Sequence, residues 1–210
     1  MTSSALVRIG GLAAIAAGAF LLGADLWSLV GGEPERFSEL AVTTSWTAVS
    51  AMYLIGVLLL LVALAGLYAR QSEAAGALGI AGFIAALIGT GLLAGMMWTM
   101  AFVVPSAAIE APAFLNAEQV AGPLDAGFML SGIAVAIGWA LFGAATLRAG
   151  VFPRIAAIVL IVGAIVTFLP LPATTVIIDV AVAWLGLHVL REISQADSTQ
   201  MEPGARPRVQ

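Results

Sequence analysis

The sequence contains no cysteine, no lysine and a single histidine, His188. Without cysteine the chain has no disulfide framework, no cysteine-ligated zinc or iron–sulfur cluster and no thiol nucleophile. One histidine cannot form a bis-histidine haem site, and without lysine no Schiff base to retinal or pyridoxal phosphate can form. We therefore expect no metal site and no cofactor.

Charged residues and catalytic motifs are equally sparse. Charged residues make up 10% of the chain, too few for a basic patch that binds nucleic acid or for the paired carboxylates of a di-metal bundle. The sequence has no GxSxG, HExxH, Walker A or GxGxxG pattern. We expect a protein that is not an enzyme and that binds no nucleic acid.

Apolar sequence dominates the chain instead. Hydrophobic residues make up 61% of it, and its mean hydropathy is +1.08. A soluble domain of 210 residues could not hide so much apolar surface, because helices that face water need a polar side. The composition predicts an all-α, polytopic transmembrane protein with the lipid bilayer as its partner.

Six apolar runs approach the length that a bilayer requires. We predict one transmembrane domain over residues 1–192, a six-helix bundle, and a disordered cytoplasmic tail over residues 193–210, which is too polar to fold. The first run is expected to stay uncleaved, because the position three before a cut after Ala24 holds Leu22, not a small residue. The predicted spans are about 9–30, 46–68, 76–104, 125–147, 155–169 and 172–191.

The arginines orient these spans. Seven of the eight fall on one side of a six-span threading, and only Arg36 falls on the other, among three glutamates. Because cytoplasmic loops carry the excess of positive charge, we expect both termini in the cytoplasm. The predicted location is the cell (cytoplasmic) membrane, as a multi-pass protein.

Asp179, at the centre of the sixth predicted span, is the most deeply placed ionisable residue. On a helix it shares a stripe with Thr175, Ala183 and Gly186, so it faces small residues rather than lipid. A charged aspartate in mid-membrane costs about 2.5–3.5 kcal/mol on insertion scales and is a functional hypothesis by default. We predict a proton, cation or ligand site there. The alternative is a structural aspartate, hydrogen-bonded to Thr175 or to a hydroxyl across the bundle.

A second acid, Asp25, lies near the outer end of the first span. It either joins Asp179 in an acidic vestibule that favours cations, or reaches interfacial water alone. Asp125 is expected to cap the fourth helix. Trp139 and Trp184 map deep in the bundle, where they pack or line a hydrophobic pocket. The candidate ligand- or proton-binding residues are Asp179, Asp25, Thr175 and Trp184.

Stripes of small residues mark the helix faces that should pack, because glycine and alanine let helices approach closely in lipid. In the third span Gly91 and Gly95 form a GxxxG pattern. This pattern suits either packing within one bundle or the face of a homodimer.

One turn resembles a known group of proteins. The segment LRAGVFPR at residues 147–154, followed by IAA at 155–157 and IVGA at 161–164, resembles a turn in bacterial six-helix membrane proteins of a domain-of-unknown-function group. The resemblance implies six helices in a bacterial cytoplasmic membrane. It assigns no functional residue.

Two classes of function stay open. The first is a small transporter-, channel- or sensor-like bundle that binds a small or lipophilic ligand, or a proton, in its outer half near Asp179. The second is a structural or accessory subunit that docks another membrane protein, or itself, through small-residue helix faces. A cavity that reaches Asp179 from outside would favour the first class, and a closed bundle would favour the second.

Overall fold

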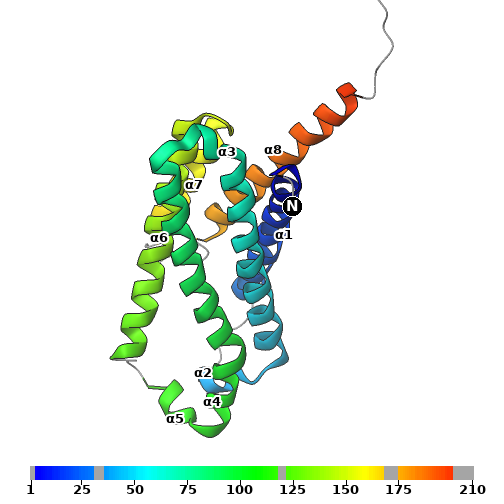
Figure 1. Ribbon diagram of the computed structural model, residues 1–210. Coiled ribbons are helices and arrows are strands. Elements are labelled where there is room, and N and C mark those ends of the chain that lie inside the picture. The colour runs from blue at the N-terminus through cyan, green and yellow to red at the C-terminus, as the bar shows by residue number, and fades with distance from the viewer. Residues whose placement is uncertain (1–2, 31–35, 118–121, 168–174, 201–210) are drawn as a thin grey trace, which may run out of the picture.

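The chain is all-α in the computed structural model, which describes residues 3–30, 36–117, 122–167 and 175–200 (Figure 1). These residues contain no strand, as the sequence predicts. The α-helices are α1 (Ser3–Val30), α2 (Phe37–Ala41), α3 (Thr44–Trp98), α4 (Val104–Glu110), α5 (Pro112–Leu115), α6 (Pro123–Ala149), α7 (Arg154–Val166) and α8 (Val176–Gln200), and a π-helical turn, η1, spans Thr99–Val103.

Among the residues that the structure describes, three helical stretches are long and apolar enough to cross a membrane. They are Ser4–Leu29, Thr44–Glu110 and Pro123–Ala149, and α7 is a shorter apolar helix. Large hydrophobic side chains such as Ile88, Ile155 and Leu130 are exposed on the outside of the fold. Length and composition thus agree with the prediction of a membrane protein.

The helix α3 folds back on itself at Gly76, whose backbone (φ 56°, ψ −149°) is not helical. It consists of a first arm, residues 44–75, and a second arm, residues 77–98. The arms run antiparallel, because the ring of Tyr68 stacks on that of Phe83 at 4.4 Å near the turn. Glycine reaches this conformation without the strain that a Cβ would cause. Residues 69–75, which the predicted spans 46–68 and 76–104 leave between them, are therefore helical, and the chain reverses at Gly76.

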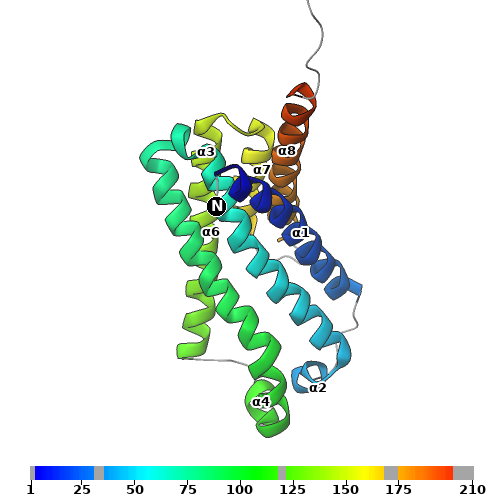
Figure 2. The ribbon, with the colours of Figure 1, turned by 45° about the vertical axis from the view of Figure 1, so that its right-hand side comes forward.

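The long helices pack as a ring of antiparallel neighbours that follows the chain (Figures 1 and 2). In order, α1 lies on the first arm of α3, the second arm on α6, α6 on α7, α7 on α8, and α8 returns to α1. Small residues set the closest approaches. A Cβ added to Gly66 would lie 2.4 Å from the Cα of Gly10, and one on Gly186 would lie 2.6 Å from the carbonyl oxygen of Gly11. The stripe that contains Asp179 and Gly186 therefore faces α1, as the prediction of small-residue packing requires.

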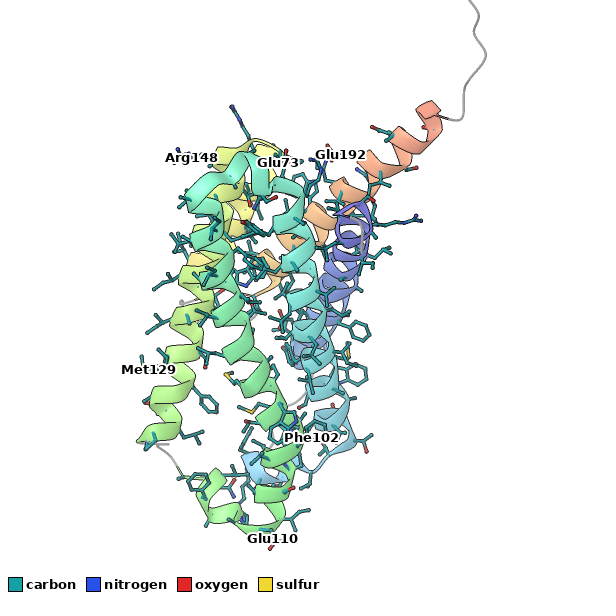
Figure 3. All side chains as sticks on the ribbon, viewed as in Figure 1. Glu73, Phe102, Glu110, Met129, Arg148 and Glu192 are labelled. Atoms are coloured by element: carbon teal, nitrogen blue, oxygen red, sulfur yellow. The ribbon has the colours of Figure 1, made fainter. Side chains whose placement is uncertain are left out.

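The two ends of the ring differ in charge. Figure 3 shows Glu73, Arg148 and Glu192 at one end, and Phe102 and Glu110 at the other. We call these the arginine end and the cap end. Among the described arginines, only Arg36, next to α2, belongs to the cap end.

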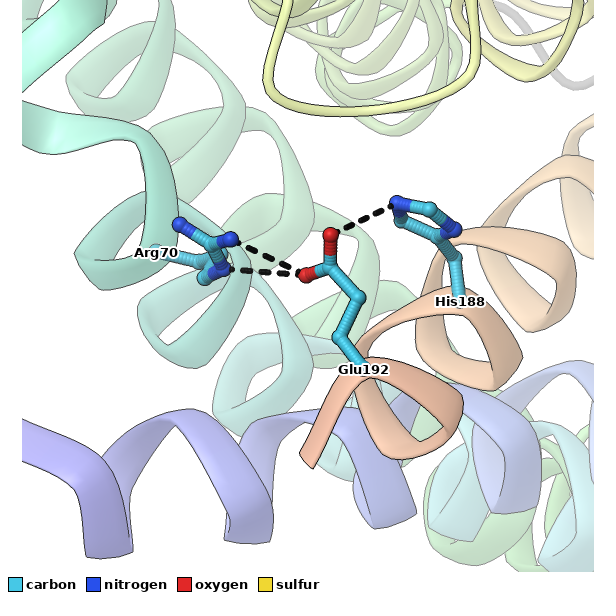
Figure 4. Close-up of polar contacts among 3 residues, drawn as sticks. All are labelled: Arg70, His188 and Glu192. Atoms are coloured by element: carbon cyan, nitrogen blue, oxygen red, sulfur yellow. Dashed lines mark hydrogen bonds and ion pairs between the residues drawn. The ribbon is translucent and has the colours of Figure 1, made fainter. Parts of the chain in front are cut away.

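A polar contact at the arginine end ties α3 to α8 (Figure 4). Both Nε and an Nη of Arg70 donate to Oε2 of Glu192, at 3.2 and 3.0 Å, and Nε2 of His188 lies 3.3 Å from Oε1 of the same carboxylate. These side chains are about a third exposed, and exposed ion pairs contribute about 0–1 kcal/mol each. The contact therefore fixes orientation more than it adds stability.

Several predicted boundaries are wrong. α8 continues to Gln200, so residues 193–200 are helical rather than disordered, while residues 201–210 lie outside the described part. Asp125 does not cap α6: Gly122 takes the N-cap position, Pro123 begins the helix, and Asp125 falls in its first turn. The connection between the third and fourth predicted spans contains the short helix α5, which begins at Pro112.

Candidate functional site

A cavity of about 600 Å³ lies toward the cap end, between α1, both arms of α3, α6 and α8. Pockets that hold small molecules span about 300–1,000 Å³ and are mostly apolar, so this cavity has the size of a ligand site. Its polar lining residues include Asp25, Ser28, Ser50, Tyr53, Thr175 and Asp179. Its apolar lining residues include Trp27, Trp46, Phe128, Trp139, Met96, Met97 and Met100.

Asp25, near the end of α1, is 6% exposed and has both carboxyl oxygens occupied. The hydroxyl of Tyr53, from the first arm of α3, donates to Oδ1 at 2.6 Å. The hydroxyl of Thr175, just before α8, donates to Oδ2 at 2.5 Å. A carboxylate acts only as an acceptor, and these short bonds have the length of hydroxyl–carboxylate contacts. Asp25 therefore links three helical elements and is fully paired within the chain.

Asp179 is the other carboxyl of the cavity, and it is not fully paired. It is 5% exposed, it lies within interacting distance of the Asp25 carboxyl, and its Oδ2 has no hydrogen-bond partner in the described structure. An unpaired buried polar group costs about 1–3 kcal/mol. The Asp179 carboxyl is thus an incomplete hydrogen-bonding site at the surface of a cavity.

The sequence-based position of Asp179 needs a correction. It was expected at the centre of its helix, but it lies in the first turn of α8, because the described part of that helix begins at Val176. The predicted structural alternative, a bond from Thr175 to Asp179, is not what forms. The Thr175 hydroxyl instead reaches across to Asp25.

The two tryptophans predicted to lie deep in the bundle, Trp139 and Trp184, differ in their surroundings. Trp139 is fully buried, lines the cavity and donates its indole N–H to Oγ1 of Thr90 at 3.0 Å. Trp184 is 37% exposed and is not among the cavity-lining residues. Of the candidate residues, the structure therefore brings Asp25, Thr175 and Asp179 together and leaves Trp184 apart.

Tyr53 is a site residue that the sequence analysis missed. The ring of a tyrosine in an apolar helix can face lipid or core equally well, so the ring does not indicate a site. The hydroxyl gives an indication, because a buried tyrosine hydroxyl usually needs a hydrogen-bond partner. Pairing that hydroxyl with the nearest deep acid would have identified it.

A cap of short helices lies beside the cavity at the cap end. Ser38 of α2 and Asn116, after α5, exchange two hydrogen bonds: Ser38 N–H to Asn116 Oδ1 at 3.0 Å, and Asn116 Nδ2 to Ser38 Oγ at 2.9 Å. Ala41, Val104 and Ala108 are buried together beneath this pair. Leu40, from α2, lines the cavity, so the cap contributes to its wall.

The π-helical turn η1 joins the second arm of α3 to this cap, and Pro105 explains it. The N–H of Val104 bonds the carbonyl of Thr99, so the next π-type bond would need an N–H from residue 105. Proline has none, which leaves the carbonyl of Met100 free. The indole of Trp46 donates to that carbonyl at 3.1 Å. Trp46 and Met100 both line the cavity, so the hydrogen bond that replaces the one lost at Pro105 lies at the cavity wall.

The cavity lining supplies groups that can bind a molecule. The described residues contain no group of three or more His, Asp or Glu side chains able to hold a metal ion. The lining offers carboxylates, hydroxyls, aromatic rings and thioethers. These groups accept hydrogen bonds, attract positive charge and pack against apolar molecules.

Comparison with known proteins identifies no related protein. No protein-family model, no curated protein and no solved structure matches the chain significantly. The resemblance of the 147–164 segment to a bacterial membrane-protein group therefore stays a prediction.

Proposed function

We propose that the chain is a multi-pass protein of a bacterial cytoplasmic membrane that crosses the bilayer six times. The crossings would be α1, the two arms of α3, α6, α7 and α8. The proposal is supported by the antiparallel ring and by the described arginines, which gather at one end apart from Arg36. The positive-inside rule puts that end, and both termini, in the cytoplasm. The cap end and the cavity then belong to the outer half.

Within this bundle, we propose that the cavity binds a small lipophilic molecule, as a transporter- or sensor-like protein would. The observation that carries the proposal is that Asp179, whose buried Oδ2 has no hydrogen-bond partner in the described structure, lines an otherwise mainly apolar cavity. A cavity of this kind provides apolar contact for affinity and a few polar groups for orientation. The bound molecule would supply what Asp179 lacks.

Two glycines of α6 give a matched test of this binding. Gly132 lines the cavity and Gly127 does not, while both are exposed and a Cβ on either would meet no atom within 4 Å. Gly132→Phe should therefore place an aromatic ring at the cavity lining, where its Cβ has room, and Gly127→Phe should leave the cavity unchanged. The measurement is equilibrium binding of radiolabelled phenylbutylamine, phenylbutanol and phenylbutanoate to the protein in nanodiscs.

We expect at least one of these three probes to bind saturably. Gly132→Phe should weaken that binding roughly ten-fold or more, the loss of about 1.4 kcal/mol of contact, and Gly127→Phe should not. If no probe binds, or if the two variants behave alike, the cavity is not a ligand site.

The accessory-subunit function is the second candidate. Gly91 and Gly95 are exposed on the second arm of α3, and a Cβ on either would meet no atom within 4 Å. The described part of the chain therefore does not pack on this GxxxG face, which suits docking of a second helix. A chain without probe binding would favour this candidate.

A further inference from the structure

The chemical class of the ligand follows from the donors that the cavity lacks; this inference rests on the proposed binding function. Asp25 has a hydroxyl donor on each carboxyl oxygen, from Tyr53 and Thr175. Asp179 beside it has an unpaired oxygen and is 95% buried, since its exposed fraction is 5%. What is missing at this point is a hydrogen-bond donor.

The cavity also lacks a positively charged side chain that could balance its two acids. The cavity lining contains two carboxyl groups and no arginine or histidine, and the chain has no lysine. The described arginine of the cap end, Arg36, is exposed and does not line the cavity. Two acids that share a cavity without a protein cation favour a ligand that brings one.

The rest of the cavity favours an apolar body attached to that charge. Aromatic faces attract cations that lie over them, and Trp46 and Trp139 both line the cavity. Met96, Met97 and Met100 line it as well, and methionine side chains adapt to varied apolar shapes. Neither feature suits a small hydrated inorganic ion.

We propose that the cavity binds a protonated lipophilic amine. Its ammonium N–H donates to the carboxyl group of Asp179, and its aryl or alkyl body packs against the tryptophans and methionines. The competing occupant is a proton held between Asp25 and Asp179. It would leave the pair with one negative charge instead of two, and it would supply the hydrogen that Asp179 lacks, so that no unpaired oxygen is left for an amine. The two cases differ in whether a charged ligand is preferred to a neutral one of the same shape.

The phenylbutyl probes test this difference, because they share one body and differ in head group. In the wild type, phenylbutylamine should bind roughly ten-fold to a hundred-fold tighter than phenylbutanol, the gain of a charge-assisted hydrogen bond. Phenylbutanoate should bind most weakly. In Asp179→Asn, the amine and the alcohol should bind with similar affinity.

Two variants control this comparison. Asp125→Asn makes the same chemical change at an exposed acid of the cap end that does not line the cavity, and it should keep the amine preference. Asp179→Glu keeps the carboxylate and should also keep it, which separates loss of charge from loss of fold.

The outcomes separate this inference from the binding function. Equal binding of amine and alcohol to the wild type, or an amine preference that survives in Asp179→Asn, would overturn the amine proposal and leave the ligand site standing. Failure of all three probes to bind would overturn both.

Discussion

Asp25 and Asp179 are the same residue type in the same cavity, yet their surroundings give them different roles. Asp25 is held by Tyr53 and Thr175, which belong to two other helical segments. It therefore acts as a fixed junction between α1, α3 and α8. Asp179 keeps an oxygen without a partner in the described structure, and the proposed ligand contact rests on this oxygen.

Removal of the Tyr53 hydroxyl tests the role of Asp25. Tyr53→Phe leaves Oδ1 of Asp25 without its donor, and hydrogen bonds to charged groups contribute about 1.5–3 kcal/mol. We expect the free energy of unfolding to fall by an amount in that range, measured by denaturant titration in detergent. Tyr68→Phe is the control, since it keeps the ring that stacks on Phe83. Equal effects of the two variants would show that the Asp25 junction is not a stabilising contact.

The sequence reveals single residues when they contrast with their surroundings. Asp25, Thr175 and Asp179 stand out because a polar group in an apolar helix costs free energy unless it has a polar partner. All three line the cavity. Whether a residue faces inward is harder to predict. The sequence places Trp184 far from the ends of its helix, yet its side chain is partly exposed. The packing of α8 on α1 decides which of its side chains face inward, and position along the helix does not.

At the scale of elements, the turn in α3 depends on one backbone conformation. The φ of Gly76 is +56°, and no atom lies within 4 Å of the position that its Cβ would take. Any cost of a side chain there is therefore conformational rather than steric. Gly91 lies in the second arm of the same helix, also in open space and with no positive φ.

Alanine at these two glycines should have opposite effects. Gly76→Ala should lower the free energy of unfolding by about 1–3 kcal/mol, since it forces an unfavourable backbone region. Gly91→Ala should raise it by roughly 0.5–1 kcal/mol, because alanine loses less entropy than glycine in a helix. Denaturant titration of both variants measures this. A stable Gly76→Ala would mean that the turn does not require glycine.

Helix boundaries show what sequence patterns miss at this scale. The pattern of prolines is consistent with α5, which begins at Pro112, because proline suits the first turn of a helix. It misses α4 and η1, because Pro105 looks like a stop and its lost hydrogen bond is compensated by Trp46, distant in sequence. It ends α8 too early, since polar residues 193–200 continue a helix that already exists.

At the scale of the whole molecule, the two ends of the fold carry different chemical groups. The arginine end carries the ion pair of Arg70 with Glu192 and the charged ends of the long helices. The cap end carries the cavity and its two acids. The all-α class follows from composition alone. The cavity does not, because it depends on how α6 and the second arm of α3 pack against their neighbours.

The central claim of the account is a bundle whose cavity opens to the outside, and cysteine labelling tests its orientation most directly because the chain has no cysteine of its own. Glu73, near the turn of α3, and Ala113, in α5, are both exposed and lie at opposite ends. In intact cells, a membrane-impermeant maleimide should label Ala113→Cys and should label Glu73→Cys only after the cells are opened. Labelling of Glu73→Cys in intact cells, with Ala113→Cys protected, would reverse the orientation and contradict an outward-facing cavity.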